Sequence, residues 1–378
     1  MNEPDDFGFS PVRTMAHVCD PVKSSDHSGF WKRWYERLVL GSPVLAERSV
    51  HDPSDPSATH DFESIGGVRI GCSLVCPPAG VPVRGAVVTT HGYTNPKPLG
   101  EAAHRWRALG DNGVAVLELR LRGYPGSRLG IGDQTTPDAT GAGWIGRGFA
   151  AEDASAWILP HAIADVCNGV RIMRNILLGR GGIRLDIDPT LDHAGVWLQG
   201  ESIGGGIATI ASSLMIGRLP NETIIDRLAI ALPSLGCWGW RLHQQCTGTT
   251  ADIRRVIEEH PERVEELVDR VRLCDAAVHA AHVRVPALAK LATRDSVVPA
   301  PAAAAVYNAI DSGPGRKWRF VVPYGHCPDA GIANARRHAL YERAMVDFFD
   351  PARRPMDSME RWEPIMNDGD QGPNGETR

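Results

Sequence analysis

The sequence predicts an α/β fold, with a mostly parallel central sheet and helices on both of its faces. Apolar strand candidates and helical segments alternate from about residue 61, which is typical of parallel sheets. Several candidates are continuous apolar runs, as expected for strands covered on both sides. At 378 residues and 43% apolar content, the chain is long enough for one large domain.

The individual elements follow from these patterns. The predicted strands are 68–75, 85–90, 114–119, 195–198, 228–232, 287–292 and 318–322. The predicted helices are 102–109, 156–177, 203–214, 302–310 and a last one, 332–349.

The organisation along the chain predicts one large domain with an N-terminal arm and a C-terminal tail. Residues 1–60 form a Pro/Asp/Ser/His-rich arm, and its aromatic helix over 30–38 is expected to dock on the body, 61–350. The stretch 242–283 is too long for a simple crossover and predicts a helical, cap-like excursion over the carboxyl edge of the sheet. Residues 351–378 hold few apolar side chains and are predicted to be disordered.

Charge and cysteine usage exclude several classes of function. The net charge is −5 without a block of like charges, so neither nucleic acid nor a membrane is expected as a partner. The acidic N-terminus lacks the order of a signal peptide, and the eight cysteines are scattered. We therefore expect a cytoplasmic protein with reduced thiols, no metal site and no cofactor.

The motif at 200–204, Gly-Glu-Ser-Ile-Gly, is the most informative feature of the chain. It closes an apolar run and opens a small-residue helix, which is the context of a nucleophile elbow. This context predicts Ser202 as the nucleophile and the N–H of Ile203 as one donor to an oxyanion.

A serine nucleophile needs a base, and the base needs an acid that fixes its tautomer. Asp295 follows the run 286–292 and His326 follows the run 318–323, both at the carboxyl ends of predicted strands. In α/β-hydrolases the acid and then the histidine come after the serine, so this order predicts a triad. Asp275 is the next candidate for the acid.

The second oxyanion donor is expected from a loop after an early strand. The candidate is the loop 91–94, which begins His-Gly-Tyr and follows the apolar run 86–90. An ordinary turn at the end of a strand is the alternative.

Further short motifs are spread between these residues. They are Asp26-x-x-x-Phe30-Trp31, Gly67-Val68-Arg69-Ile70, His91-Gly92-Tyr93, Arg122-Gly123, Arg147-Gly148, Cys274-Asp275, Asp295-Ser296-Val297-Val298-Pro299 with Ala305-Val306-Tyr307-Asn308-Ala309-Ile310, and Tyr324-Gly325-His326. With the elbow, they make residues 26–350 resemble the acetyl xylan esterases and cephalosporin-C deacetylases, a branch of the α/β-hydrolases.

The resemblance implies a fold, an activity and a set of residues. It implies Ser202, Asp295 and His326 as the triad, and Tyr93 and Ile203 as backbone oxyanion donors. The implied substrate is a small-molecule ester, a sugar-like alcohol that carries a short acyl group, mainly acetyl. Relatives often form hexameric rings, so a homo-oligomer is expected.

Several positions near the expected site differ from the family pattern or add to it. Tyr124 and Ile203 stand where glutamine is usual, and Cys327 stands where glutamate is common. Tyr124, Trp238 and Trp240 could line a substrate pocket, although packing roles for the two tryptophans fit the sequence equally well. Other hydrolase activities of this fold (peptidase, lactonase or thioesterase) and a non-catalytic binding protein stay open as alternatives.

Overall fold

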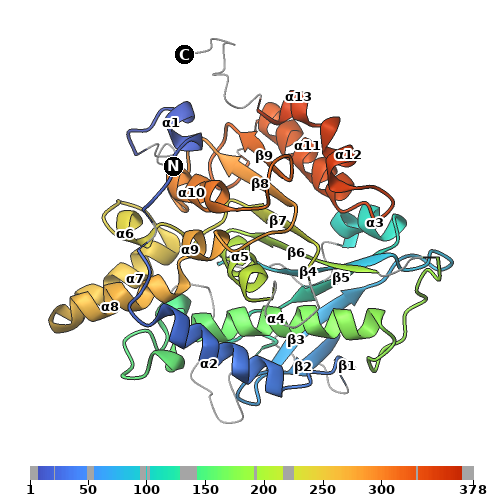
Figure 1. The fold of residues 1–378 in the computed structure, drawn as a ribbon, viewed down its shortest axis with the longest axis horizontal. Coiled ribbons are helices and arrows are strands. Elements are labelled where there is room, and N and C mark those ends of the chain that lie inside the picture. Colours follow the sequence, from blue (N-terminus) through green and yellow to red (C-terminus); the bar gives the residue numbers. More distant parts are fainter. Residues whose placement is uncertain are drawn as a thin grey trace.

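The computed structural model describes residues 7–20, 22–48, 55–93, 99, 103–127, 143–190, 194–215, 225–328 and 331–367. Its strands are β1 (Ala46–Glu47), β2 (His60–Glu63), β3 (Arg69–Val75), β4 (Gly85–Thr90), β5 (Val114–Leu119), β6 (Gly195–Glu201), β7 (Arg227–Ala231), β8 (Ala287–Ala292) and β9 (Lys317–Val322). They form a nine-stranded sheet of order β1-β2-β3-β5-β4-β6-β7-β8-β9 (Figure 1).

The sheet is parallel from β5 through β9, and β1, β2 and β3 extend it in antiparallel fashion. The predicted α/β class and all seven predicted strands are confirmed. Because β4, β6, β7, β8 and β9 run the same way, the loops after them meet at one edge of the sheet.

Helices cover both faces. They are α1 (Pro11–Met15), α2 (His27–Leu40), α3 (Ala103–Asp111), α4 (Ile158–Leu177), α5 (Ile203–Met215), α6 (Trp238–Arg241), α7 (Gly248–Glu258), α8 (Val264–Val271), α9 (Ala276–Ala280), α10 (Ala300–Ala309), α11 (Ile332–Phe348), α12 (Pro355–Glu360) and α13 (Glu363–Met366). One hydrophobic core lies between the sheet and helices α4, α5 and α10. A second core lies on the opposite face, between the sheet and helices α3, α11, α12 and α13 (Figure 1). None of the described helices combines the length and apolar character that crossing a membrane requires.

The N-terminal arm is part of this architecture. Its predicted aromatic helix is α2, and Phe30, Trp31 and Trp34 are buried against the body, as expected. Arg171 of α4 donates to the carbonyl oxygens of Leu38 and Gly41 and fixes the end of α2. Because β1 and β2 also pair with the sheet, the boundary placed at residue 60 cuts through a strand.

The prediction of disorder after residue 350 is wrong for residues 351–367, which form α12 and α13. The few apolar side chains there recur at helical spacing: Met359, Trp362 and Met366 are buried against the sheet. Trp362 also donates its indole N–H to Asp347 at 2.7 Å. Residues 368–378 lie outside the described part of the chain.

The excursion over 242–283 is helical, as predicted. It contains α7 and α8, which Figure 1 draws near α6, and α9, which packs against α5 and α10. The backbone N–H of Thr247 donates to the carbonyl of Ser296, in the loop after β8, which places the excursion at the carboxyl edge.

Candidate active site

Ser202 lies in the tight turn between β6 and α5. Its φ of 58° is in the left-handed region, which L-residues rarely adopt. The backbone N–H of Ser202 donates to the carbonyl of Ala231 on β7 at 2.8 Å, and Ser234 donates to the carbonyl of Ser202 at 2.9 Å. Neighbouring strand ends thus hold the serine in a strained conformation at the sheet edge.

The glycines around Ser202 are required by close backbone approach. A Cβ at Gly200 would collide with the carbonyl of Gly204. A Cβ at Gly204 would lie 2.9 Å from the carbonyl oxygen of Thr90, at the end of β4. The glycines therefore let α5 start directly against both β6 and the loop after β4.

Asp295 and His326 are brought together from the loops after β8 and β9. His326 Nδ1 lies 2.8 Å from Asp295 Oδ2. The other carboxylate oxygen accepts the backbone N–H groups of Val297 at 2.8 Å and Val298 at 3.0 Å, so Asp295 is fixed on both sides. This arrangement puts the proton on Nδ1 and leaves Nε2 as the basic nitrogen.

The surroundings of His326 favour its protonated form. Burial lowers the pKa of His326, but the hydrogen bond and negative charge of Asp295, with a contribution from Glu201, outweigh burial and raise it. The Ser202 hydroxyl makes no hydrogen bond to any described residue, His326 included. Such contacts are often long without substrate and tighten when it binds.

Asp275, the alternative acid, has a different role in the structure. Its carboxylate caps α9 and accepts backbone N–H groups from Cys237, Trp238 and Ala277. Burial raises the pKa of Asp275, against the opposing effect of these three hydrogen bonds. The carboxylate bonded to His326 is that of Asp295.

The loop after β4 packs against the elbow, as an oxyanion loop must. A Cβ at Gly92 would lie 3.9 Å from the Cβ of Ser202. Ile203 is the first residue of α5, so its N–H has no acceptor within the helix. Its side chain is fully buried in the core, so only its backbone is placed to take part.

Both ends of Tyr93 are fixed by hydrogen bonds. The Tyr124 hydroxyl donates to the carbonyl of Tyr93. The Tyr93 hydroxyl donates to Asp252 of α7 at 2.6 Å and accepts the N–H of Ile145 at 3.2 Å. Asp252 also accepts the N–H of Gly143 at 2.9 Å, so the excursion helix holds the loop after β4.

His91, the first residue of this loop, is held in one neutral tautomer. Nε2 accepts the N–H of Leu121 at 3.1 Å, so the ring proton is on Nδ1, which donates to the carbonyl of Gly92 at 2.7 Å. Burial and the nearby Arg120 lower the pKa of His91 to about 3, against the opposing effect of the Gly92 hydrogen bond. His91 is therefore a neutral support of the loop.

Comparison with known proteins agrees with this geometry. A model of the acetyl xylan esterase (AXE1) family matches residues 19–325. The chain belongs to the acetyl xylan esterase family. It is thus a carboxylic ester hydrolase, and the fold and resemblance predicted from the sequence are confirmed.

Solved structures share the fold of this esterase. An acetyl xylan esterase from a Thermoanaerobacterium species is 21% identical, with a TM-score of 0.64 over 86% of this chain and 96% of its own. One from a Paenibacillus species is 18% identical, with a TM-score of 0.65 over 90% and 98%. The Pyrococcus horikoshii acylaminoacyl peptidase is 12% identical, with a TM-score of 0.51 over 77% and 40%. No protein of curated function matches the sequence.

The two tryptophans of the esterase suggested as pocket walls have packing roles. Trp238 is fully buried, and its indole N–H donates to the carbonyl of Cys274 at 3.3 Å. Trp240 packs against rings of the N-terminal segment, Phe7, Phe9 and His17. Tyr124, the third suggested wall, is also fully buried and supports the loop after β4.

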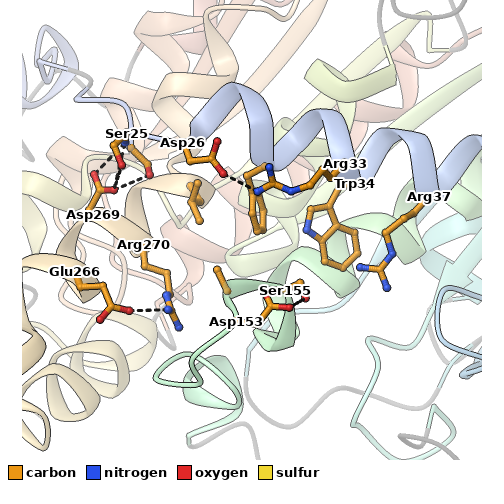
Figure 2. Close-up of a pocket in the computed structure, with 14 residues that line it drawn as sticks. Ser25, Asp26, Arg33, Trp34, Arg37, Asp153, Ser155, Glu266, Asp269 and Arg270 are labelled. Atoms are coloured by element: carbon orange, nitrogen blue, oxygen red, sulfur yellow. Dashed lines mark hydrogen bonds and ion pairs between the residues drawn. The ribbon is translucent and has the colours of Figure 1, made fainter.

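A cavity of about 370 Å³ lies at the seam between α2 and α8, and none of these three residues lines it. Figure 2 shows two ion pairs among its lining side chains: Arg33 with Asp26 at 2.6 Å, and Arg270 with Glu266 at 2.7 Å. Asp269 accepts from the Ser25 hydroxyl at 2.8 Å. The seam therefore joins the arm to the excursion of the esterase.

In the described part of the esterase, no group of three or more His, Cys, Asp or Glu residues could hold a metal ion.

The sequence analysis overlooked Asp252, which lies 159 positions from Tyr93, the residue it bonds. It also overlooked Lys290, although a lysine inside an apolar strand is a visible signal.

The support from Tyr124 gives a testable prediction for the esterase. Tyr124→Phe leaves the buried carbonyl of Tyr93 without its hydrogen-bond donor. We therefore expect kcat/KM to fall about 10-fold and the free energy of unfolding to fall by about 2 kcal/mol. Hydrolysis of p-nitrophenyl acetate and denaturant unfolding measure the two effects. Tyr307→Phe, in the buried face of α10, is the control. A loss of stability alone would contradict the positioning of Tyr93.

Proposed function

We propose that the protein is a serine esterase that removes short acyl groups, mainly acetyl, from sugar-like alcohols through an acyl-enzyme. The observation that carries the proposal is the His326–Asp295 hydrogen bond, formed at the same sheet edge as the strained Ser202. Family membership supports the ester as the substrate class.

In the first half of the reaction, Ser202 Oγ attacks the ester carbonyl while His326 Nε2 takes the hydroxyl proton. Asp295 keeps the other ring proton on Nδ1 and stabilises the imidazolium. The oxyanion accepts hydrogen bonds from the backbone N–H groups of Tyr93 and Ile203. The C–O bond to the alcohol breaks, and His326 returns the proton to the leaving oxygen.

In the second half, water attacks the acyl-enzyme. His326 takes one proton from the water, the oxyanion forms again in the same place, and the bond to Ser202 breaks. The proton returns to Ser202 Oγ, and the carboxylate product leaves. The same groups therefore serve both halves in reversed roles.

The direct test is a rate profile across p-nitrophenyl esters from acetyl to octanoyl, combined with rapid mixing. We expect a burst of p-nitrophenol with the acetyl ester and a kcat/KM at least about 10-fold higher for acetyl than for octanoyl. A fluorophosphonate probe should label Ser202, as located by peptide mass spectrometry. Release of acetate from acetylated xylose and xylo-oligosaccharides then tests the alcohol.

Each remaining alternative predicts a different outcome. Faster turnover of an amide, lactone or thioester than of acetyl esters would favour another hydrolase activity. Folded protein without labelling or turnover would favour a binding role.

The proposal also includes a homo-oligomer, a hexamer by the resemblance, and a cytoplasmic location. Light scattering measures the oligomeric state, and cell fractionation measures the location. The eight cysteines are free thiols in the structure.

A further inference from the structure

Lys290 is a buried cation that the reaction described above does not use. It lies in the middle of β8, where every side chain is buried, and its own side chain is 1% exposed. A cation in such a place is costly unless an anion and further polar groups compensate it.

The register of the sheet explains how Lys290 is compensated. Glu201 of β6 pairs with Ala231 of β7, which pairs with Lys290, so the three residues form one row across the strands. Neighbouring strands are about 4.8 Å apart, so the lysine must reach across two such spacings. The small side chain of Ala231 leaves room for it, and Lys290 Nζ meets Glu201 Oε1 at 2.7 Å. Tyr341 of α11 covers the ammonium group, 5.2 Å from its ring centroid.

This row lies directly beside the catalytic residues. Glu201 immediately precedes Ser202, and the Ala231 carbonyl accepts the Ser202 N–H. The Lys290 carbonyl accepts the N–H of Leu232, and five residues later the same segment supplies Asp295. The charged groups that act on His326 are Glu201 from β6 and Lys290 and Asp295 from β8 and its loop. On its own loop, His326 stands between Cys327 and Gly325, and the Tyr324 hydroxyl lies 3.4 Å from His338 Nδ1 of α11.

A stabilising role alone does not account for the pair. Replacing a buried ion pair by apolar side chains of similar volume is often neutral or stabilising, so folding gains little from it. We propose that Glu201 and Lys290 are positioning residues for the hydrolysis, which together set the pH range in which His326 is the free base. The proposal rests on the proposed function, because it needs His326 to act as that base.

The expected signs follow from the charges. Burial, which lowers the pKa of His326, and Asp295, which raises it, have the largest effects. Glu201 raises this pKa further, and Lys290 lowers it by a smaller amount. Lys290→Met removes the opposing cation, so the acid limb of the kcat/KM profile should move up by about 1 pH unit. Glu201→Gln removes the larger effect, so it should move the limb down by at least as much. The direction is the same even if the unpaired lysine loses its proton. The double variant should lie between the two.

The test compares pH profiles for p-nitrophenyl acetate among these three variants. Lys290→Arg keeps the cation, so the acid limb of its kcat/KM profile should stay at the wild-type position. Lys317→Met is the matched control, because that lysine also covers a tyrosine ring, Tyr307 at 5.0 Å, but lies at the amino end of β9. Glu201, with a side chain 33% exposed, tolerates substitution better than Lys290, so Glu201→Gln alone decides if Lys290→Met does not fold.

NMR titration of the His326 ring in the Ser202→Ala protein gives the same answer without turnover. Its resonances are assigned by their loss in His326→Asn. The inference is overturned if the limb and the ring titration of Glu201→Gln stay within 0.2 units of wild type or rise, or if both single variants shift in one direction. Shifts of opposite sign in the ring titration, together with a wild-type protein that does not hydrolyse esters, would leave the electrostatic pair standing and refute the proposed function.

Discussion

Ser202→Ala is expected to lower kcat for p-nitrophenyl acetate by about 10⁶-fold. Without Oγ no acyl-enzyme forms, and only the oxyanion donors and substrate binding still favour attack by water. The residual rate should show no burst, because release of p-nitrophenol would no longer precede a slower hydrolysis. Rapid-mixing kinetics and the loss of fluorophosphonate labelling measure both consequences.

Ser212→Ala is the matched control for this substitution. Ser212 lies on α5, the helix that begins after the elbow, and its hydroxyl is buried without a hydrogen-bond partner in the part of the chain that the structure describes. Removing that hydroxyl should therefore leave both turnover and stability near wild type. If Ser202→Ala kept more than about one-thousandth of the wild-type kcat, the nucleophile would have to be another group.

Asp295→Asn is expected to lower kcat by about 10⁴-fold with the fold intact. Asp295 Oδ1 accepts the N–H groups of Val297 and Val298, so the amide oxygen of asparagine would take that side. Its NH₂ group would then face His326 Nδ1 and make that nitrogen an acceptor. The ring proton would move to Nε2, the atom that must receive the proton of Ser202.

The same substitution should also lower the pKa of His326, because the charge and hydrogen bond that raise it are gone. NMR of the imidazole nitrogens distinguishes the two tautomers directly. Asp275→Asn is the control: it disturbs the cap of α9 and lowers stability, but turnover per folded molecule should hold. If Asp275→Asn lost turnover by about 10⁴-fold while Asp295→Asn did not, the acid of the triad would be Asp275.

Features that depend on local pattern could be predicted from the sequence. The strand over 85–90 is a short apolar run, and the elbow at 200–204 follows from glycine spacing, so both are recognisable without tertiary information. The candidate triad depends on order along the chain and on the rule that parallel strands place their loops at one edge. For the same reason, the pairing of His326 with Asp295 needed only the fold class.

Features that depend on side chains meeting across the fold could not be predicted. The partner of Lys290 lies 89 positions away, and only the register through Ala231 brings Glu201 to it. The tail over 351–367 looked disordered because its composition is polar, while its order comes from a few apolar side chains that complete an existing core. Likewise, nothing in the sequence near Tyr124 indicates that its hydroxyl would reach the backbone of Tyr93.

Asp252 ties the catalytic rate to a helix that lies outside the catalytic loops. One carboxylate, on a helix of the excursion, bonds both the Tyr93 side chain and the turn at Gly143. Changes in that helix that displace Asp252 would therefore also disturb the peptide proposed to stabilise the oxyanion. Variants selected in the laboratory for new esters should therefore keep their catalytic rate best when Asp252 is unchanged.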